Sequence, residues 1–175
     1  MRSSKSSARA LVDTAAGEIS REIFVNEDLY AEEKARIFSR AWLYVGHESQ
    51  IKNNGDYFVS KMGEESVILT RDFDGKVHVF LNSCAHRGMR VCRYDEGNTK
   101  VFRCPYHSWT YKTDGTLLGV QDYENAYQPP FDKSKWGLIE VAQLASYMGT
   151  IWATWDKDAP PFHEYLGEAR FGFDQ

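Results

Sequence analysis

The chain has 175 residues, which is enough for one sizeable hydrophobic core with an appendage, and its net charge is −4. That acidic balance argues against nucleic acid as a partner. No apolar run approaches the roughly 20 residues that a membrane-spanning helix requires, so a membrane is not expected as a partner either. Aromatic residues make up 14% of the chain, which suits a compact β-rich domain.

The N-terminal part predicts a tail followed by one helix. Residues 1–25 are polar and lack the hydrophobic stretch of a secretory signal, so we expect a disordered tail. Asn26 followed by two acidic residues is typical of a helix N-cap and first turn. Apolar residues then recur at helical spacing, which predicts a helix from about Asp28 to Trp42 whose apolar stripe packs against the core.

From Asp56 onward the pattern changes to short strands. Strands are predicted at residues 57–59, 67–69, 77–81, 101–103, 109–111, 117–118, 138–141 and 148–155. Two hairpin-turn signals, Asp74-Gly75 and Asp114-Gly115, join neighbouring strands. Residues 121–136 read as a connecting loop, and residues 156–175, with Pro160-Pro161, as a linker or the start of another domain. We therefore expect one domain over residues 26–155.

Two short segments each bring a cysteine and a histidine together. Cys84-Ala85-His86 is followed after seventeen residues by Cys104-Pro105-Tyr106-His107. Two thiolates and two imidazoles match a Rieske [2Fe–2S] centre, in which two histidines replace two cysteines on one iron. Neutral imidazoles leave the oxidised centre formally uncharged, which makes it easier to reduce than an all-cysteine cluster. The pattern predicts that Cys84, His86, Cys104 and His107 bind this cluster, with the cysteines on the inner iron.

Structural zinc is the competing interpretation of four such ligands. Zinc fingers usually place the two cysteines together and then the two histidines, whereas this chain interleaves them. The third cysteine, Cys92, has no intrachain disulfide partner if the other two bind metal. That suits a reducing compartment, so we expect a cytoplasmic location, with Cys92 as a buried thiol.

The motifs resemble a known family. They are Asn82-x-Cys84-x-His86-Arg87-Gly88 and Cys104-x-Tyr106-His107-x-Trp109, flanked by Arg40-x-Trp42-x-x-Val45, Gly55-Asp56-Tyr57 and Ala159-Pro160-Pro161. Over about residues 25–170 the chain resembles the N-terminal part of the alpha (large oxygenase) subunit of Rieske non-haem iron aromatic-ring-hydroxylating dioxygenases. The resemblance implies a mainly β fold: an antiparallel β sandwich of Rieske type with an N-terminal helix and a small cluster-binding subdomain at about residues 82–120. Ser108 stands where this family commonly has glycine.

The resemblance also implies a role in electron transfer. In this family a ferredoxin or reductase reduces the Rieske cluster, which passes electrons to a mononuclear iron that dihydroxylates an aromatic ring. By motif position His107 is the implied relay, through a carboxylate of a neighbouring alpha subunit in a trimer. Beta subunits are further candidate partners in the full enzyme.

The mononuclear Fe(II) is expected outside this chain. A facial triad needs two histidines and one carboxylate, and only His163 follows the second ligand segment. A missing catalytic domain is therefore expected to hold that iron, and this oxidoreductase component is not expected to be catalytically competent alone. A stand-alone Rieske ferredoxin remains the alternative, although such carriers usually lack the helix before the β domain.

Two further features lead to hypotheses about electron transfer. Trp109 stands where high-potential respiratory Rieske proteins have a hydroxyl donor, so we expect a low-potential centre within the Rieske range. Five basic residues lie close together in the acidic chain, namely Arg87, Arg90, Arg93, Lys100 and Arg103. They indicate either a docking surface for an acidic ferredoxin or a solvated loop.

Overall fold

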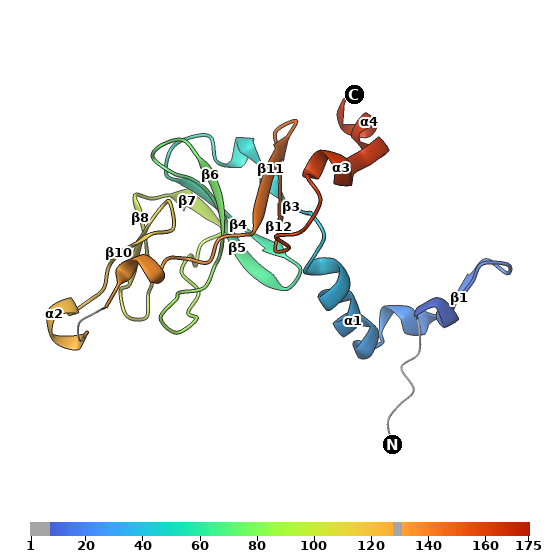
Figure 1. Ribbon diagram of the computed structural model, residues 1–175, viewed down its shortest axis with the longest axis horizontal. Helices are drawn as coiled ribbons and strands as arrows, with labels where there is room; N and C mark the ends of the chain where they lie inside the picture. The colour runs from blue at the N-terminus through green and yellow to red at the C-terminus, as the bar shows by residue number, and fades with distance from the viewer. Residues whose placement is uncertain (1–7, 128–130) are drawn as a thin grey trace, which may run out of the picture.

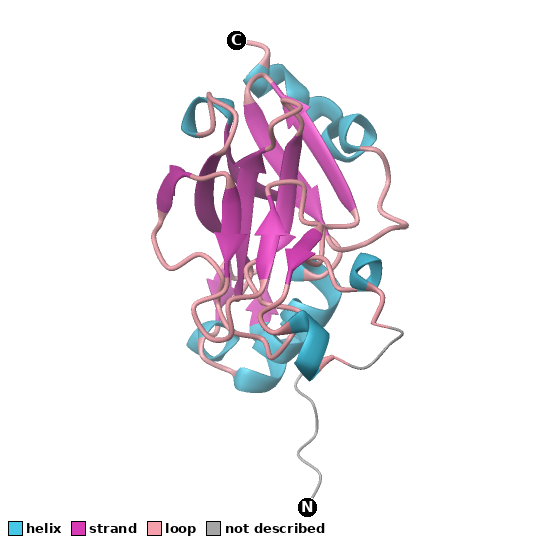
Figure 2. Cartoon of the chain, turned by 90° about the vertical axis from the view of Figure 1, so that its left-hand side faces the viewer, coloured by secondary structure: helices cyan, strands magenta, loops and turns pink. Residues whose placement is uncertain are grey.

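The computed structural model describes residues 8–127 and 131–175. Two antiparallel sheets form its body, which confirms the mainly β fold class. One sheet contains β4 (Asp56–Met62), β5 (Glu65–Arg71), β6 (Val77–Leu81) and β7 (Glu96–Asn98), in the order β6-β5-β4-β7. The other contains β3 (Leu43–His47), β11 (Gln143–Tyr147) and β12 (Thr150–Thr154), in the order β11-β12-β3 (Figure 1). Figure 2 shows the strands as a central layer, with helices mainly at its two ends.

Strand β5 contributes to two hydrophobic cores. Side chains alternate between the faces of a strand, and on β5 both faces are buried. Val67 and Leu69 pack with Val45 and Ile151 between the two sheets. Ile68 packs on the other face, in the core that also contains the cysteines. The centre of this strand is therefore continuously apolar in sequence and does not alternate between apolar and polar residues.

A third sheet of three short strands lies next to the core around the cysteines. It contains β8 (Val101–Arg103), β9 (Thr110–Lys112) and β10 (Leu117–Gly119), in the order β10-β9-β8. Both predicted hairpin turns are confirmed, one between β5 and β6 and one between β9 and β10. Gly75 and Gly115 each have a φ of +82°, which glycine adopts without steric strain.

The predicted helix forms but is shorter than expected. It begins as α1 (Glu27–Glu33) after Asn26, whose side-chain oxygen accepts hydrogen bonds from two backbone N–H groups of the first turn. A π-helical turn, η3 (Lys34–Phe38), follows, so the helix ends at Phe38 and not at Trp42. Trp42 is instead buried beside the start of β3, where its indole N–H donates to the carbonyl of Pro160 at 2.9 Å.

The apolar stripe of this helix does not pack against the core as predicted. Leu29 is buried, but Tyr30 and Ile37 are 41% and 52% exposed. The helix belongs to an arm that projects from the β body, so most of its surface has no sheet to pack against (Figure 1). Sequence periodicity identified the helix correctly but could not show how far it stands from the body.

Residues 8–25 form short elements where a disordered tail was expected. They are η1 (Ala8–Leu11), β1 (Val12–Asp13), β2 (Glu18–Ile19) and η2 (Arg21–Phe24). The Asp13 carboxylate accepts hydrogen bonds from the N–H groups of Ala15 and Ala16, and Gly17 has a φ of +69° in the turn between β1 and β2. None of these elements contains a buried residue. The rest of the predicted tail, residues 1–7, lies outside the described residues.

The strand predicted at residues 138–141 is wrong. This segment makes one isolated bridge to β6, because Leu138 packs in the core around the cysteines and Val141 in the core between the sheets. The strand that pairs with β12 is instead β11. Met148 and Gly149 join them with φ values of +48° and +78°, a left-handed pair typical of a tight hairpin.

Short helices occupy the remaining segments. The predicted loop at residues 121–136 contains α2 (Tyr123–Ala126) and η5 (Lys133–Lys135), and its residues 128–130 lie outside the described residues. Residues 156–175, expected as a linker or domain start, contain α3 (Phe162–Leu166), η6 (Gly167–Ala169) and α4 (Arg170–Phe173). Phe162 packs edge-on against Trp42, with the ring centroids 5.3 Å apart, so this segment contacts the body. No helix in the described ranges is long and apolar enough to cross a membrane.

His78 lies between two carboxylates at the edge of the first sheet. Its Nε2 is 3.0 Å from the buried Asp72, and its Nδ1 is 2.8 Å from Glu140 in the segment before β11. Burial opposes the charged imidazolium, but the two carboxylates outweigh burial and raise the pKa of His78. The pKa of Asp72 is lowered, because its hydrogen bonds to His78 and to backbone N–H groups outweigh its burial.

These two shifts predict a window of pH in which the fold is most stable. The contribution of His78 is present below its unfolded pKa and is lost as the pH rises through its raised folded pKa. The contribution of Asp72 is present above its unfolded pKa and is lost as the pH falls through its depressed folded pKa. We expect His78→Gln to cost about 1–3 kcal/mol at pH 6 and much less at pH 9, measured by urea unfolding. An equal cost at both pH values would contradict this assignment.

Candidate metal centre

The four predicted ligands lie on two loops that close in the same way. Cys84 begins a loop between β6 and β7, and Cys104 begins the loop between β8 and β9. In each loop the cysteine N–H donates at 2.8 Å to the carbonyl five residues later, at Met89 and Trp109. In each loop the cysteine carbonyl also accepts a hydrogen bond from the N–H four residues later, which is Gly88 at 2.8 Å and Ser108 at 3.0 Å. The protein therefore presents two copies of one turn, each with its cysteine at the start.

The two cysteines lie side by side in the core. Both are buried free thiols, and the side chain of Cys104 neighbours that of Cys84. Burial raises the pKa of the Cys84 thiol, against the opposing effect of a hydrogen bond from Tyr111. A thiol held protonated in this way needs a cation to become the thiolate that binds metal.

Tyr111 connects the base of both loops. Its hydroxyl oxygen accepts from the backbone N–H of Ala85 at 3.1 Å and lies 3.1 Å from the sulfur of Cys84. A metal-bound thiolate has no proton, so the hydroxyl must be the donor to that sulfur. The pKa of Tyr111 is raised, chiefly by burial, so the hydroxyl remains protonated and available as a donor.

The two histidines also form a pair. The ring centroids of His86 and His107 are 4.7 Å apart, and both side chains are partly buried. Nδ1 of His107 is buried and has no hydrogen-bond partner among the described residues. A buried polar atom without a partner is costly, and an iron–nitrogen bond would satisfy it. Burial, with His107 and Arg87 nearby, lowers the pKa of His86, which favours the neutral imidazole that a metal ligand requires.

Two aromatic rings cover the histidines. Trp109 stacks on His86 with centroids 4.9 Å apart and only 6° between the ring planes. Its indole N–H donates to the hydroxyl of Tyr127 at 2.9 Å, so it points away from the histidines. The ring of Tyr106 lies over that of His107, with the ring centroids 3.7 Å apart, and Tyr106 is 56% exposed. One imidazole is thus enclosed by the core and the other lies beneath a solvent-facing ring.

The arrangement matches the ligand pattern of a two-iron cluster. Structural zinc with two cysteines and two histidines needs four ligands around one point. A [2Fe–2S] core instead takes two protein ligands on each iron, which matches a cysteine pair and a separate histidine pair.

Asn82 holds the first loop in place, a role that sequence reasoning did not assign. The side chain is buried, and its Oδ1 accepts from the N–H groups of Val91 and Cys92 at 3.0 and 2.8 Å. Its Nδ2 donates to the carbonyl of Cys92 at 2.9 Å. The sequence signal was Asn82 itself, an amide two residues before a ligand. Cys92 is a buried thiol, and burial raises its pKa to about 12.

Ser108 has the conformation that glycine has in the matching turn. Gly88 and Ser108 both lie four residues after a cysteine, with φ values of +69° and +58°. Left-handed backbone costs a non-glycine residue about 1 kcal/mol or more. We expect Ser108→Gly to raise the free energy of unfolding by about 0.5 kcal/mol, once the greater chain entropy of glycine is subtracted. Gly88→Ala is the reciprocal test and should lower the free energy of unfolding by about 1–2 kcal/mol. The new Cβ would lie 3.7 Å from the Ser83 hydroxyl, which is an ordinary contact, so the cost would come from backbone strain alone.

Tyr111 is expected to tune the redox potential. A hydrogen bond to a ligand sulfur stabilises the extra negative charge of the reduced state. Tyr111→Phe should therefore lower the midpoint potential by tens of millivolts, since about 1.4 kcal/mol corresponds to about 59 mV for one electron. Voltammetry of the wild type and variant measures this. Tyr106→Phe is the control, because the Tyr106 hydroxyl is solvent-facing, and an equal shift in both variants would contradict the role of Tyr111.

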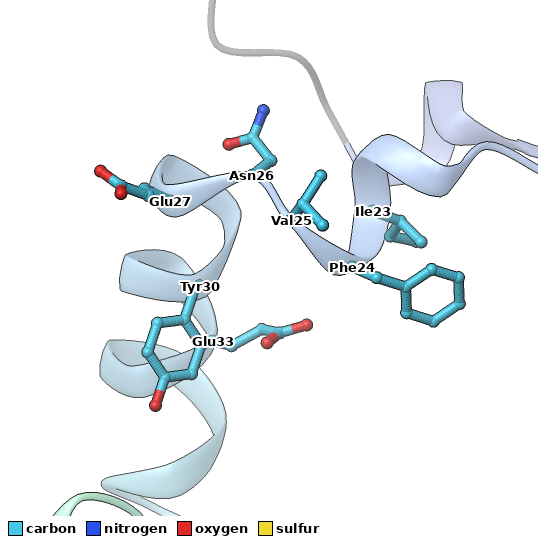
Figure 3. Close-up of a pocket in the computed structure, with 7 residues that line it drawn as sticks. All are labelled: Ile23, Phe24, Val25, Asn26, Glu27, Tyr30 and Glu33. Atoms are coloured by element: carbon cyan, nitrogen blue, oxygen red, sulfur yellow. The ribbon is translucent and has the colours of Figure 1, made fainter.

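A hollow elsewhere on the molecule is not part of this centre. It lies between η2 and the first turns of α1 on the N-terminal arm (Figure 3). Its lining residues are Ile23, Phe24, Val25, Asn26, Glu27, Tyr30 and Glu33. None of them is a thiol or imidazole, and the hollow is far along the arm from the third sheet (Figure 1).

Comparison with known proteins agrees with this geometry. A family model described as Rieske [2Fe-2S] domain matches residues 41–136. The chain is 49% identical over 166 residues to chlorobenzene dioxygenase subunit alpha of Cupriavidus sp. (strain PS12), covering 95% of this chain and 36% of that protein. It is 47% identical over 164 residues to biphenyl 2,3-dioxygenase subunit alpha of Rhodococcus jostii (strain RHA1), covering 94% and 35%. The solved structure of naphthalene 1,2-dioxygenase from Rhodococcus sp. superposes with a TM-score of 0.82 and 43% identity, covering 85% of this chain and 34% of that chain.

The chain belongs to the Rieske [2Fe-2S] domain family, and its cofactor is a Rieske [2Fe–2S] cluster. It spans about a third of the length of the curated relatives that it matches. Those relatives are alpha subunits of dioxygenases, which are oxidoreductases with more than one kind of subunit. The predicted family, fold class and cofactor are confirmed by these matches.

Proposed function

We propose that this chain is the electron-transfer module of an aromatic-ring-hydroxylating dioxygenase alpha subunit. The observation that carries the proposal is the pair of equivalent loops, which place Cys84 beside Cys104 and His86 beside His107 in a chain aligned with dioxygenase alpha subunits. These four side chains would hold the cluster, which when bound accepts and releases one electron at a time.

The protein's own groups then have separate tasks. The two cysteines bring negative charge into the core, and Tyr111 supplies a hydrogen-bond donor to one of them. The histidines bring no charge, and His107 lies beneath the exposed ring of Tyr106. A coordinated imidazole keeps its second ring N–H for an outer acceptor, so His107 is the proposed exit toward a carboxylate of a neighbouring alpha subunit.

The wider partners follow from the same relatives. A ferredoxin or reductase would supply the electrons, and a mononuclear iron in a catalytic domain outside this chain would dihydroxylate an aromatic ring. We propose a trimer of alpha subunits, with beta subunits as further partners and the cytoplasm as location. The alternative is a stand-alone Rieske ferredoxin. The mass of the native polypeptide separates the two, because a native protein of only this length would refute the dioxygenase module.

Voltammetry of the reconstituted protein tests the proposed function directly. We expect a reversible one-electron couple in the lower part of the Rieske range, near about −150 mV, because the indole N–H of Trp109 donates to Tyr127 and not to the cluster. A couple near about +300 mV would contradict the low-potential assignment. The absence of any reversible couple in protein that contains iron and sulfide would refute electron transfer itself.

A further inference from the structure

The basic segment between the two ligand loops lies on the surface. Residues 87–103 contain five basic and two acidic side chains, whereas the whole chain has a net charge of −4. All five basic side chains are exposed. The ion pairs among the described residues involve none of these five. The segment is therefore a local positive region whose charges are not used to stabilise the fold.

Two of these arginines share a hollow next to the second ligand loop. Arg93 and Arg103 line it together with Tyr94 and Pro105, and its inner wall includes Cys92. Pro105 directly follows Cys104 and is two residues from His107, so the hollow borders the loop that carries both ligands. Two exposed arginines line this hollow, and arginine binds carboxylates through paired hydrogen bonds, so the hollow suits a carboxylate.

Exposed aromatic rings lie in the same part of the sequence. Tyr94 is 78% exposed at this hollow, and the exposed ring of Tyr106 covers His107. Small contact areas with a few exposed rings and a charged rim are typical of transient protein–protein encounters, such as those of redox carriers. Charges at the rim speed association more than they increase affinity.

We propose that Arg93, Arg103 and the neighbouring basic side chains form the docking surface for an acidic one-electron carrier protein, with a carboxylate of the carrier seated in the hollow. The inference rests on the proposed function, because it names where the electron donor binds. It replaces the interpretation of this segment as a solvated loop, since a solvated loop has no reason to place two arginines at one opening beside a ligand loop. Arg87 and Arg90 are further exposed arginines of the same segment, on the first loop.

Stopped-flow reduction of the reconstituted full chain tests the surface. The probe is a reduced, acidic plant-type [2Fe–2S] ferredoxin, and bleaching of the visible absorbance reports electron transfer. We expect Arg93→Glu/Arg103→Glu to lower the second-order rate constant at least about tenfold at low ionic strength. The rate constant of the wild type should fall steeply with added salt, because salt screens the attraction between the two proteins. The rate constant of the variant should depend little on salt.

The control has the same change in charge elsewhere. Arg9→Glu/Lys157→Glu alters two exposed basic residues on the N-terminal arm and after β12, and should keep the wild-type rate and salt dependence. Arg93→Gln/Arg103→Gln is the milder variant if the charge reversal impairs folding, and it should show an intermediate loss. Complete bleaching by dithionite in every variant shows that the cluster is present, so a docking failure is distinguishable from a failure of the proposed function.

Two results would overturn the proposal. One is an unchanged rate and salt dependence in the arginine variants while dithionite still reduces them fully. The other is self-association of the wild-type chain that the same variants abolish, which would assign the surface to a second copy of this acidic chain and not to a carrier. Sedimentation of the wild type and variants measures this second result.

Discussion

Replacing Cys104 with alanine is expected to leave a chain that retains neither iron nor sulfide after reconstitution and desalting. The buried thiol of Cys104 neighbours that of Cys84, and losing either would leave one iron with a single protein ligand. The same loss is expected for Cys84→Ala. Iron and acid-labile sulfide measured against protein concentration check both variants.

Cys92→Ala is the matched control for these variants. Cys92 is also a buried free thiol, so its replacement removes the same atom from the same core. We expect a loss of about 1 kcal/mol in stability, the usual effect of a single substitution, and full retention of iron and sulfide. Loss of the cluster in Cys92→Ala, or its retention in Cys104→Ala, would show that the ligands have been misassigned.

Asn82→Leu is expected to destabilise the fold strongly. The leucine would leave the N–H groups of Val91 and Cys92 and the carbonyl of Cys92 without their partner inside the protein. Each buried backbone group without a partner costs about 1–3 kcal/mol. The total is therefore about 3 kcal/mol or more, a large share of the roughly 5–15 kcal/mol that stabilises a typical domain.

Urea unfolding and cluster content measure this effect together. Asn82→Asp keeps the acceptor for two N–H groups and loses the donor to the Cys92 carbonyl and the Ser66 hydroxyl, so it should cost less than Asn82→Leu. Asn125→Leu is the surface control, because the Asn125 amide donates to the exposed Asp122, and we expect a change within about 0.5 kcal/mol. If Asn82→Leu were as mild as this control, the first loop would not depend on the buried amide.

The ligand pattern and the hairpins were predictable because their signals are local. A cysteine and a histidine two or three residues apart must lie on the same loop, whatever the rest of the fold does. Asp-Gly at a hairpin turn predicts strand pairing for a similar reason, since glycine permits the left-handed backbone that the turn needs. The signals at Gly75 and Gly115 therefore led to correct strands on both sides of each turn.

The errors arose where distant contacts decide the outcome. The helix was predicted to reach Trp42, but that residue is buried against Pro160, which is 118 positions away in the chain. The segment at residues 138–141 has the composition of a strand, but its apolar residues belong to two different cores. Ser108 stands where the family commonly has glycine, but serine itself carries no sequence signal for the positive φ that it shares with Gly88.

Pulsed EPR of the reduced protein, labelled with ¹⁵N only in histidine, tests the central claim most directly. We predict hyperfine coupling of the unpaired electron to two histidine nitrogens. A spectrum without histidine coupling, or protein that binds zinc and contains no sulfide, would contradict the account.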